Sequence, residues 1–438
     1  MTGRAASLAF LIAALAVGGR AGAQDQPTAF IGATILPVAG QPITNGVLVV
    51  QGGRILGVGP AGMALPPGTA VRDVSGRVLL PGLVDTHSHI GEVSGADGST
   101  PIQPEVRVID ALDVHDPSLQ RARAGGITTA NVMPGSGHLI SGQTLYLKLR
   151  QAHRVEDLLL TNRLGRVAGG LKMANGTNSR REPPFPGTRG KSAALVREKY
   201  VAAQDYLAKI ERAKGDATKM PPRDLALETL GEVLSGDRVV QHHTHRHDDI
   251  LTVLRLQKEF GFKVVLHHVS DGWKVAEDIA AAKVPCSVIV IDSPGGKLEA
   301  RDMDWKTAAV LEKAGVTVGF HTDDPVTDSR LFLRSAALAV RSGMTREGAL
   351  RAVTAAGAEI LDLKQRVGTL EPGKDADFVV LSGDPLSVYT KVLETWVEGA
   401  RVFDRADPKD RLIATGGVGA GNPRAARLCC FGTWGGDE

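Results

Sequence analysis

Between residues 81 and 365 the chain alternates short apolar runs with segments in which apolar residues recur every three or four positions. Apolar runs bounded by glycine and polar residues predict buried strands, whereas the longer spacing predicts helices packed against them. The strand-like runs are GLVDTHSH, ITTANVM, TLYLKLR, GGLKMAN, RVVQHHTH, KVVLHHV, CSVIVID and VTVGFHTDD. Eight strands separated by helices predict an α/β fold, a (β/α)8 TIM-type barrel, which ordinarily takes about 250 residues.

The barrel pattern is interrupted by an insertion at residues 176–237. A Pro- and Arg-rich stretch, TNSRREPPFPGTRGK, precedes two helix-like segments, SAALVREKYVAAQDYLAKIERA and PRDLALETLGEVLSG. Loops that follow barrel strands stand at the face where active sites form. We therefore expect the insertion to be either a lid or specificity loop, or a solvated excursion of the surface.

Two further regions, residues 24–80 and residues 366–412, read as short strands separated by Gly and Pro turns. Short apolar runs with turn residues between them are typical of antiparallel sheets. Because the two regions flank the barrel at residues 81–365, we expect them to pair into one small β-sandwich domain built from both ends of the chain.

Residues 1–23 have the pattern of an export signal, with an early arginine, an apolar run and small residues before Gln24. The run is shorter than the roughly 20 apolar residues that cross a bilayer, so we expect a cleaved signal peptide and no membrane span in the mature chain. The protein is then exported, to the periplasm or the medium. At the other end, the Gly-rich composition of residues 413–438 predicts a disordered tail.

The charge pattern bears on the partner. The 51 Lys and Arg residues nearly balance the 48 Asp and Glu residues, and the sequence has no basic block with interleaved aromatic residues. Nucleic-acid-binding proteins ordinarily carry such a basic footprint. We therefore do not expect nucleic acid as a partner.

Residue types that bind metals stand at the ends of four predicted strands. His87 and His89 lie two residues apart, so their side chains share one strand face, a spacing that suits two imidazoles on one ion. His243 and His268 end two further strands, and Asp323 ends the last one. Each has a simpler explanation, such as a buried structural histidine or, for Asp323, a helix cap. Because the carboxyl ends of barrel strands meet, the set as a whole predicts a metal site.

The ligand types narrow the choice of metal. Imidazole and carboxylate ligands without a thiolate suit zinc, manganese, iron or cobalt, and we take zinc as the default. A catalytic ion also needs an open position for water and a base beside it. Asp323 is the candidate for that base.

In this order the motifs resemble the amidohydrolase superfamily and, within it, the imidazolonepropionase-like and Xaa-Pro dipeptidase-like branch. The matching motifs are PGLVDTHSH, AGGITTANVMPGSGHLISGQ, VVQHHTHRHDDI, VVLHHVSDG, GFHTDDPV and VGTLEPGKDADFVVLSGDPL. The resemblance covers almost the whole mature chain except the insertion and the tail. It implies that His87 and His89 bind one metal ion and that His243 and His268 bind a second. It also implies that Asp323 ligates the first ion and shuttles a proton.

In binuclear members of the superfamily, a lysine on the fourth strand, carboxylated by carbon dioxide, bridges the two ions. Lys172 in GGLKMANG stands at that position, with Lys148 in YLKLR as the rival. Carboxylation turns a cation into an anionic oxygen ligand, whereas an ammonium group would repel the ions. Members with one ion also occur, so the resemblance implies one or two divalent ions per chain.

The strand register does not decide the roles of several further histidines. His243 and His245 share a strand face and His242 lies on the opposite one, so His245 is either a ligand or a substrate contact. His267 occupies a place where relatives often carry an acidic residue. His138, in the loop PGSGHLISGQ, is a further candidate for substrate binding.

The expected activity is that of an amidohydrolase, which cleaves the C–N bond of an amide, cyclic amide or dipeptide with a hydroxide activated by the metal, Asp323 acting as proton shuttle. One alternative is a lactone or phosphotriester hydrolase on the same metal site. Another is an exported protein that binds metal or solute without catalysis. The expected partner is a small amide or peptide. Arg180, Arg181, Arg189 and Lys191 either receive its carboxylate or, as is more usual for a basic run, are simply solvated. A homo-oligomer is also open, because barrels of this kind often pair.

Overall fold

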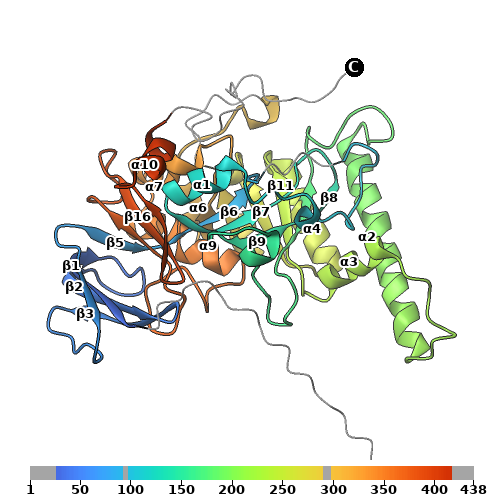
Figure 1. The fold of residues 1–438 in the computed structure, drawn as a ribbon. Coiled ribbons are helices and arrows are strands. Elements are labelled where there is room, and N and C mark those ends of the chain that lie inside the picture. Colours follow the sequence, from blue (N-terminus) through green and yellow to red (C-terminus); the bar gives the residue numbers. More distant parts are fainter. Residues whose placement is uncertain (1–25, 92–96, 290–296, 417–438) are drawn as a thin grey trace, which may run out of the picture.

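The computed structural model describes residues 26–91, 97–289 and 297–416. The expected signal peptide lies outside the described residues. Figure 1 shows a small sheet at one end, where blue N-terminal strands meet red C-terminal ones, and a strand-rich body in the middle. The green helices α2 and α3 stand at the opposite end.

The small domain is one sheet of eight strands drawn from both ends of the chain. Its strands are β1 (Thr28–Ile35), β2 (Ile43–Gln51), β3 (Arg54–Pro60), β4 (Ala70–Asp73), β5 (Val78–Pro81), β15 (Phe378–Leu381), β16 (Val392–Val397) and β17 (Ala400–Asp404). The order is β17-β16-β15-β5-β1-β2-β3, with β4 paired to β1. Hydrogen bonds therefore join strands from the two regions into one sheet, as the expected pairing of the two ends of the chain requires.

The pairing of β5 with β15 closes the small domain. These strands are antiparallel, with Phe378 opposite Pro81. Three aromatic rings stabilise the contact, because Phe30 lies 4.9 Å from Phe378 and 5.1 Å from Trp396 between ring centroids. Apolar residues at opposite ends of the sequence thus share one core.

The body contains nine short strands. They are β6 (Leu83–Ser88), β7 (Ile127–Val132), β8 (Ile140–Gln143), β9 (Leu145–Lys148), β10 (Leu171–Ala174), β11 (Val240–Thr244), β12 (Val264–His268), β13 (Cys286–Val288) and β14 (Val318–Phe320). Strands β10 to β14 pair in parallel in chain order, and so do β6 and β7. Parallel strands buried on both faces are typical of α/β proteins.

The third expected barrel strand departs from the parallel pattern. The run TLYLKLR forms β9, which pairs antiparallel with β7, and β8 pairs antiparallel with β10. A parallel neighbour requires a crossover connection, usually a helix. The segment between β7 and β9 contains only loop and the short strand β8, so the chain returns in the opposite direction.

The first and last strands of the body lie side by side. Thr86 Oγ1 donates to the carbonyl of Phe320 at 2.9 Å, and the amide of Asp323 donates to the carbonyl of His87 at 2.9 Å. These contacts bring the carboxyl ends of β6 and β14 together without a ladder between their sheets in the described part of the chain.

In the described residues, ten α-helices surround the strands or follow them. They are α1 (Pro117–Ala124), α2 (Arg189–Ala213), α3 (Leu225–Leu234), α4 (His247–Phe260), α5 (Ala276–Ala281), α6 (Thr307–Lys313), α7 (Phe332–Arg341), α8 (Arg346–Ala352), α9 (Ala355–Ile360) and α10 (Pro408–Thr415). Within the described ranges, no helix is both long and apolar enough to span a membrane. Helix α10 extends three residues into the expected tail, and residues 417–438 lie outside the described part.

The insertion helices form where the sequence expects them, and they pack along the side of the body. Thr188 caps α2 by accepting from the amide of Lys191, and Asp224 caps α3 in the same way. Tyr200 on α2 is fully buried and stacks on Phe260 and Phe262, which flank the end of α4. Helix α2 is therefore part of the outer wall rather than a lid.

Buried charges connect the body to the small domain. Lys148 Nζ lies 2.9 Å from Asp375 Oδ2 and also contacts Asp377. The guanidinium of Arg150 binds both carboxylate oxygens of Glu398 at 2.7 and 2.8 Å. Such paired contacts fix the orientation of two surfaces as well as holding them together.

Candidate active site

The carboxyl ends of β6, β11, β12 and β14 carry a cluster of histidines at one end of the body. Strands β6, β11 and β12 are buried along their whole length. A polar side chain at such a position needs a partner, either in the protein or in a bound group. His87, His243 and His268 lie within these strands, whereas His89, His245 and Asp323 follow the strand ends.

One part of the cluster joins the first and last strands. Asp323 Oδ1 lies 3.2 Å from His87 Nε2 and 3.0 Å from His89 Nε2, and the two imidazole nitrogens are 3.3 Å apart. Nδ1 of His89 lies 2.7 Å from the carbonyl oxygen of Met133. A carbonyl only accepts, so Nδ1 carries the proton and Nε2 keeps its lone pair. Two histidines and a carboxylate thus present ligand atoms to one point.

The structure distinguishes the two candidate lysines. Lys172 on β10 is fully buried, and its Nζ lies 3.1 Å from His87 Nε2. Burial lowers the pKa of Lys172 to about 7. Lys148 instead pairs with Asp375 and Asp377. Only Lys172 belongs to the histidine cluster.

A second part of the cluster consists of His243, His245 and His268. Each offers a ring nitrogen within 4.8 Å of the others. Both ring nitrogens of His243 and Nε2 of His268 are buried without a hydrogen-bond partner. Unpaired buried nitrogens are costly unless another group binds them. Three imidazoles with free lone pairs fit a divalent cation, and so does the set around Asp323.

The protonation states also suit metal binding. Burial lowers the pKa of His87, His243 and His268 well below the usual value of 6.5. Burial likewise lowers the pKa of His245 to about 3. For Asp323, burial acts to raise the pKa, but the contact with His89 and the charges of His321 and Lys172 act in the opposite direction, so the pKa is lowered. Neutral imidazoles and an ionised carboxylate are the ligand forms that a metal needs.

Two features position Asp323. Asp85 accepts hydrogen bonds from the amide and the hydroxyl of Thr322 at 3.0 and 2.5 Å, which ties β6 to the segment before Asp323. Asp323 itself has φ of 51° and His268 has φ of 70°. Non-glycine residues in this left-handed region store strain and often mark functional sites. The fold thus holds Asp323 and His268, two of the candidate ligands, in unfavourable backbone conformations.

Two histidines extend the cluster beyond the predicted set. His321 Nδ1 lies 2.7 Å from Ser287 Oγ, and His321 Nε2 lies 3.4 Å from His268 Nδ1. His267 Nε2 lies 2.7 Å from Gln241 Oε1, which is an acceptor, so that nitrogen carries the proton. With His87 these two form a further group of convergent nitrogens. The signal for His321 was its place directly after the strand β14, whose carboxyl end meets the other histidine-bearing strands.

The remaining predicted residues lie around this centre. His242 Nδ1 lies 3.0 Å from the carbonyl oxygen of His243, so that nitrogen donates to the backbone of the next residue. His138 is buried, packs against Phe185 and lies 3.4 Å from Arg181 Nη2. The structure therefore places His138 in the loop that meets the insertion.

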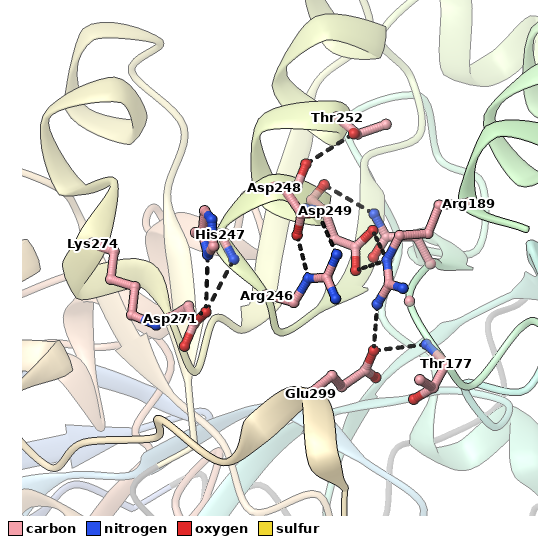
Figure 2. A network of polar contacts seen from close by, with 12 residues as sticks. Thr177, Arg189, Arg246, His247, Asp248, Asp249, Thr252, Asp271, Lys274 and Glu299 are labelled. Carbon is pink, nitrogen blue, oxygen red and sulfur yellow. Dashed lines mark hydrogen bonds and ion pairs between the residues drawn. The ribbon is translucent and has the colours of Figure 1, made fainter.

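The basic residues of the insertion are mostly engaged. Arg189 pairs with Asp249 at 2.8 Å and with Glu299 at 3.3 Å, as Figure 2 shows. Arg180 donates to the carbonyl of Gly176 at 3.0 Å. The guanidinium of Arg181 lies over the ring of Phe185, 3.7 Å from its centroid. Arg189 already has its counterions and is not free to receive a substrate carboxylate.

Comparison with solved structures identifies the family. The crystal structure of an amidohydrolase from Thermotoga maritima matches with a TM-score of 0.81 and 33% identity, over 86% of this chain and 100% of that one. The chain belongs to the amidohydrolase family. The model of the Amidohydrolase family matches residues 188–403.

The similarity of this amidohydrolase to curated proteins supports the same family. The chain is 30% identical to the amidohydrolase tasK of Hapsidospora irregularis over 78% of this chain, although it spans only 38% of that protein's length. It is 26% identical to an imidazolonepropionase of Rhizobium meliloti, over 78% of this chain and 86% of that protein. These likenesses confirm the resemblance to the imidazolonepropionase-like branch of the superfamily.

The family relationship settles the class of fold and of reaction. The chain is an α/β protein whose family relationship implies a TIM-type barrel with an extra domain, and it is a metal-dependent enzyme that hydrolyses C–N bonds. The buried histidine groups supply ligands for the divalent ion that this chemistry uses.

Proposed function

We propose that this amidohydrolase cleaves a small cyclic amide or a dipeptide, with one or two zinc ions as cofactor. The likeness to imidazolonepropionase supports a cyclic amide. The ligand types, imidazole and carboxylate without thiolate, support zinc as the first choice. The observation that carries the proposal is the convergence of His87, His89 and Asp323 within 3.3 Å of one another.

Two sets of residues would hold the ions. His87, His89 and Asp323 form the first set, and His243, His245 and His268 form the second. Bound there, a divalent ion would lower the pKa of water toward about 7 and polarise the substrate carbonyl.

Asp323 is the proton carrier of the proposal. Its carboxylate takes the proton from the attacking water and then delivers it to the leaving nitrogen as the C–N bond breaks. A low pKa keeps Asp323 ionised and ready to accept at neutral pH. The hydrogen bonds from Thr322 to Asp85 hold the segment that carries this carboxylate.

Lys172 is the bridging residue of the proposal. As the uncharged amine it would attack carbon dioxide, form an N–C bond and lose one proton, which gives an anionic carbamate. Complete burial beside His87 supports this role, because an ammonium group has no place next to a divalent cation. The carbamate of Lys172 would then be a further anionic ligand for the ions held by the two sets of residues.

The test is metal content and turnover of protein purified without chelator. Plasma mass spectrometry is expected to find one or two ions per chain, and a panel of cyclic amides and dipeptides is expected to contain substrates. Hydrolysis of esters or phosphotriesters faster than any amide would contradict the proposed substrate class. Protein that takes up neither zinc nor manganese would contradict the metal sites.

A further inference from the structure

A cationic side chain that the proposed mechanism does not use points into the histidine cluster. Lys297 follows β13, and its Nζ lies 3.5 Å from Nε2 of His245. The side chain is half-buried. An ammonium group carries three donors, and a single imidazole nitrogen satisfies one of them at most.

The nearest carboxylates already have partners. Asp323 and Glu299 are the acidic residues whose charges act on Lys297. Asp323 contacts His87 and His89. In Figure 2, Glu299 accepts from the amide of Thr177 at 2.7 Å and from Arg189 at 3.3 Å. Both carboxylates therefore bind other residues rather than Lys297.

The surroundings of Lys297 differ from those of Lys274, which has two carboxylate partners. Lys274 lies 3.2 Å from Asp271 and contacts Asp302 at 2.5 Å. Among the described residues, no carboxylate oxygen lies within 4.0 Å of Lys297 Nζ. A cation removed from water without a counterion is costly, and it becomes more so beside divalent ions. The described residues therefore leave the ammonium group of Lys297 without a contacting counterion.

We propose that Lys297 binds a carboxylate of the substrate, so that the enzyme prefers amides that carry a free carboxylate close to the scissile bond. The proposal rests on the proposed function, because it takes the histidine cluster as the place where the C–N bond is cleaved. It assigns the anion to Lys297 rather than to the arginines of the insertion. Arg189 has two carboxylate partners, whereas Lys297 has none in the described part of the chain.

The geometry also explains why the contact with His245 does not satisfy Lys297. Nδ1 of His245 lies 2.8 Å from Ser270 Oγ, which leaves Nε2 as the nitrogen that faces Lys297. When Nε2 binds a cation its lone pair is used, and the ammonium group loses its only recorded acceptor. A substrate carboxylate then offers Lys297 a charge-assisted hydrogen bond.

The experiment compares acids with their neutral counterparts. Calorimetry on the metal-loaded enzyme measures the Kd of N-acetylglycine, N-acetylalanine and N-acetylproline and of the three carboxamides. Wild type is expected to bind the acids more tightly. Lys297→Met is expected to lose about 10- to 100-fold in affinity for the acids and little for the amides, as for a charged hydrogen bond. Lys297→Arg is expected to retain part of the preference.

A matched control removes the positive charge of another lysine, Lys306. Lys306 pairs with Asp304 and lies over the ring of Trp273, away from the histidines. Lys306→Met is expected to leave the preference for acids unchanged, which excludes a general effect of net charge. Equal binding of acids and amides by wild type, or a preference that survives in Lys297→Met, would overturn the assignment.

Turnover separates this proposal from the one it rests on. If acids bind through Lys297 but no amide, cyclic amide or dipeptide is cleaved, then the proposed function fails while the anion site stands. If amides are cleaved with equal kcat/KM in wild type and Lys297→Met, with or without a carboxylate, then the anion site fails while the function stands.

Discussion

Nζ of Lys172 lies 3.1 Å from Nε2 of His87, and both side chains are fully buried. A positive ammonium group at this distance competes with any cation for the lone pair of His87. The pair is therefore compatible with a metal only when Lys172 is neutral or carries a carboxylate.

Replacing Lys172 tests whether it is a ligand. In Lys172→Ala we expect the metal content to fall by about one ion per chain or to zero, because the bridging oxygens are gone. Plasma mass spectrometry on protein purified without chelator measures this. Lys191→Ala, on the exposed side of α2, is the matched control and should keep the wild-type content. One ion per chain in both wild type and Lys172→Ala would remove Lys172 from the site.

Replacing Asp323 tests the proton shuttle. Asp323→Asn keeps the shape of the side chain but cannot accept the proton, so we expect kcat to fall by about 100- to 10,000-fold. Part of the metal should remain, since Asp323 is one ligand among several. Steady-state kinetics together with metal analysis distinguish the two effects. Near-normal turnover in Asp323→Asn would assign the proton transfer to another group.

Removing the metal should lower the stability of the fold. His243 and His268 would be left with buried, unpaired nitrogens, whereas an ion at about 100 times its Kd stabilises the folded state by about 2.7 kcal/mol. We expect Tm to fall after dialysis against chelator and to rise with added zinc in a concentration-dependent way. In His243→Ala the rise should be smaller. A Tm that changes neither with chelator nor with added zinc would contradict a metal bound to the folded chain.

The buried junction between the barrel and the small domain gives a stability prediction that is independent of the metal. Lys148→Met leaves the carboxylate of Asp377 buried without its cation, and breaking such a pair costs about 3 to 5 kcal/mol. Denaturant unfolding measures the loss. The double variant Lys148→Met/Asp377→Asn should recover part of it, and a single variant as stable as wild type would show that Asp377 is protonated in the folded protein.

The ion pair between Arg150 and Glu398 predicts a pH dependence of stability. Burial acts to raise the pKa of Glu398, but the hydrogen bond from Arg150 and nearby cations outweigh it and lower the pKa from 4.5 to about 2. A folded-state pKa below the unfolded one stabilises at pH values above the unfolded pKa, and this contribution is lost as the pH falls.

We therefore expect Glu398→Gln to be less stable than wild type by about 1 to 3 kcal/mol at pH 7. The difference should narrow as the pH falls from about 4.5 toward about 2. Urea unfolding of both proteins between pH 7 and pH 3 tests this. A difference that stays constant over that range would mean that the carboxylate charge contributes nothing.

The sequence by itself determined that the side chains of His87 and His89 lie close together at the end of the first body strand. His87 and His89 alternate with Ser88, so their side chains share a face whatever the rest of the chain does. The helix caps at Thr188 and Asp224 are local in the same sense, because each joins residues three positions apart. Local spacing fixes local geometry.

Tertiary structure decided which residues meet. Both Lys172 and Lys148 lie on short buried strands, and only the direction of β9 placed Lys148 against Asp375 and Asp377. That direction follows from the missing helix between β7 and β9, which the apolar pattern of TLYLKLR does not reveal. His321 and Lys297 joined the cluster in the same way, through strands whose carboxyl ends come together in space. Contacts between distant segments depend on strand order and direction, and these are set by packing of the whole chain rather than by any one segment.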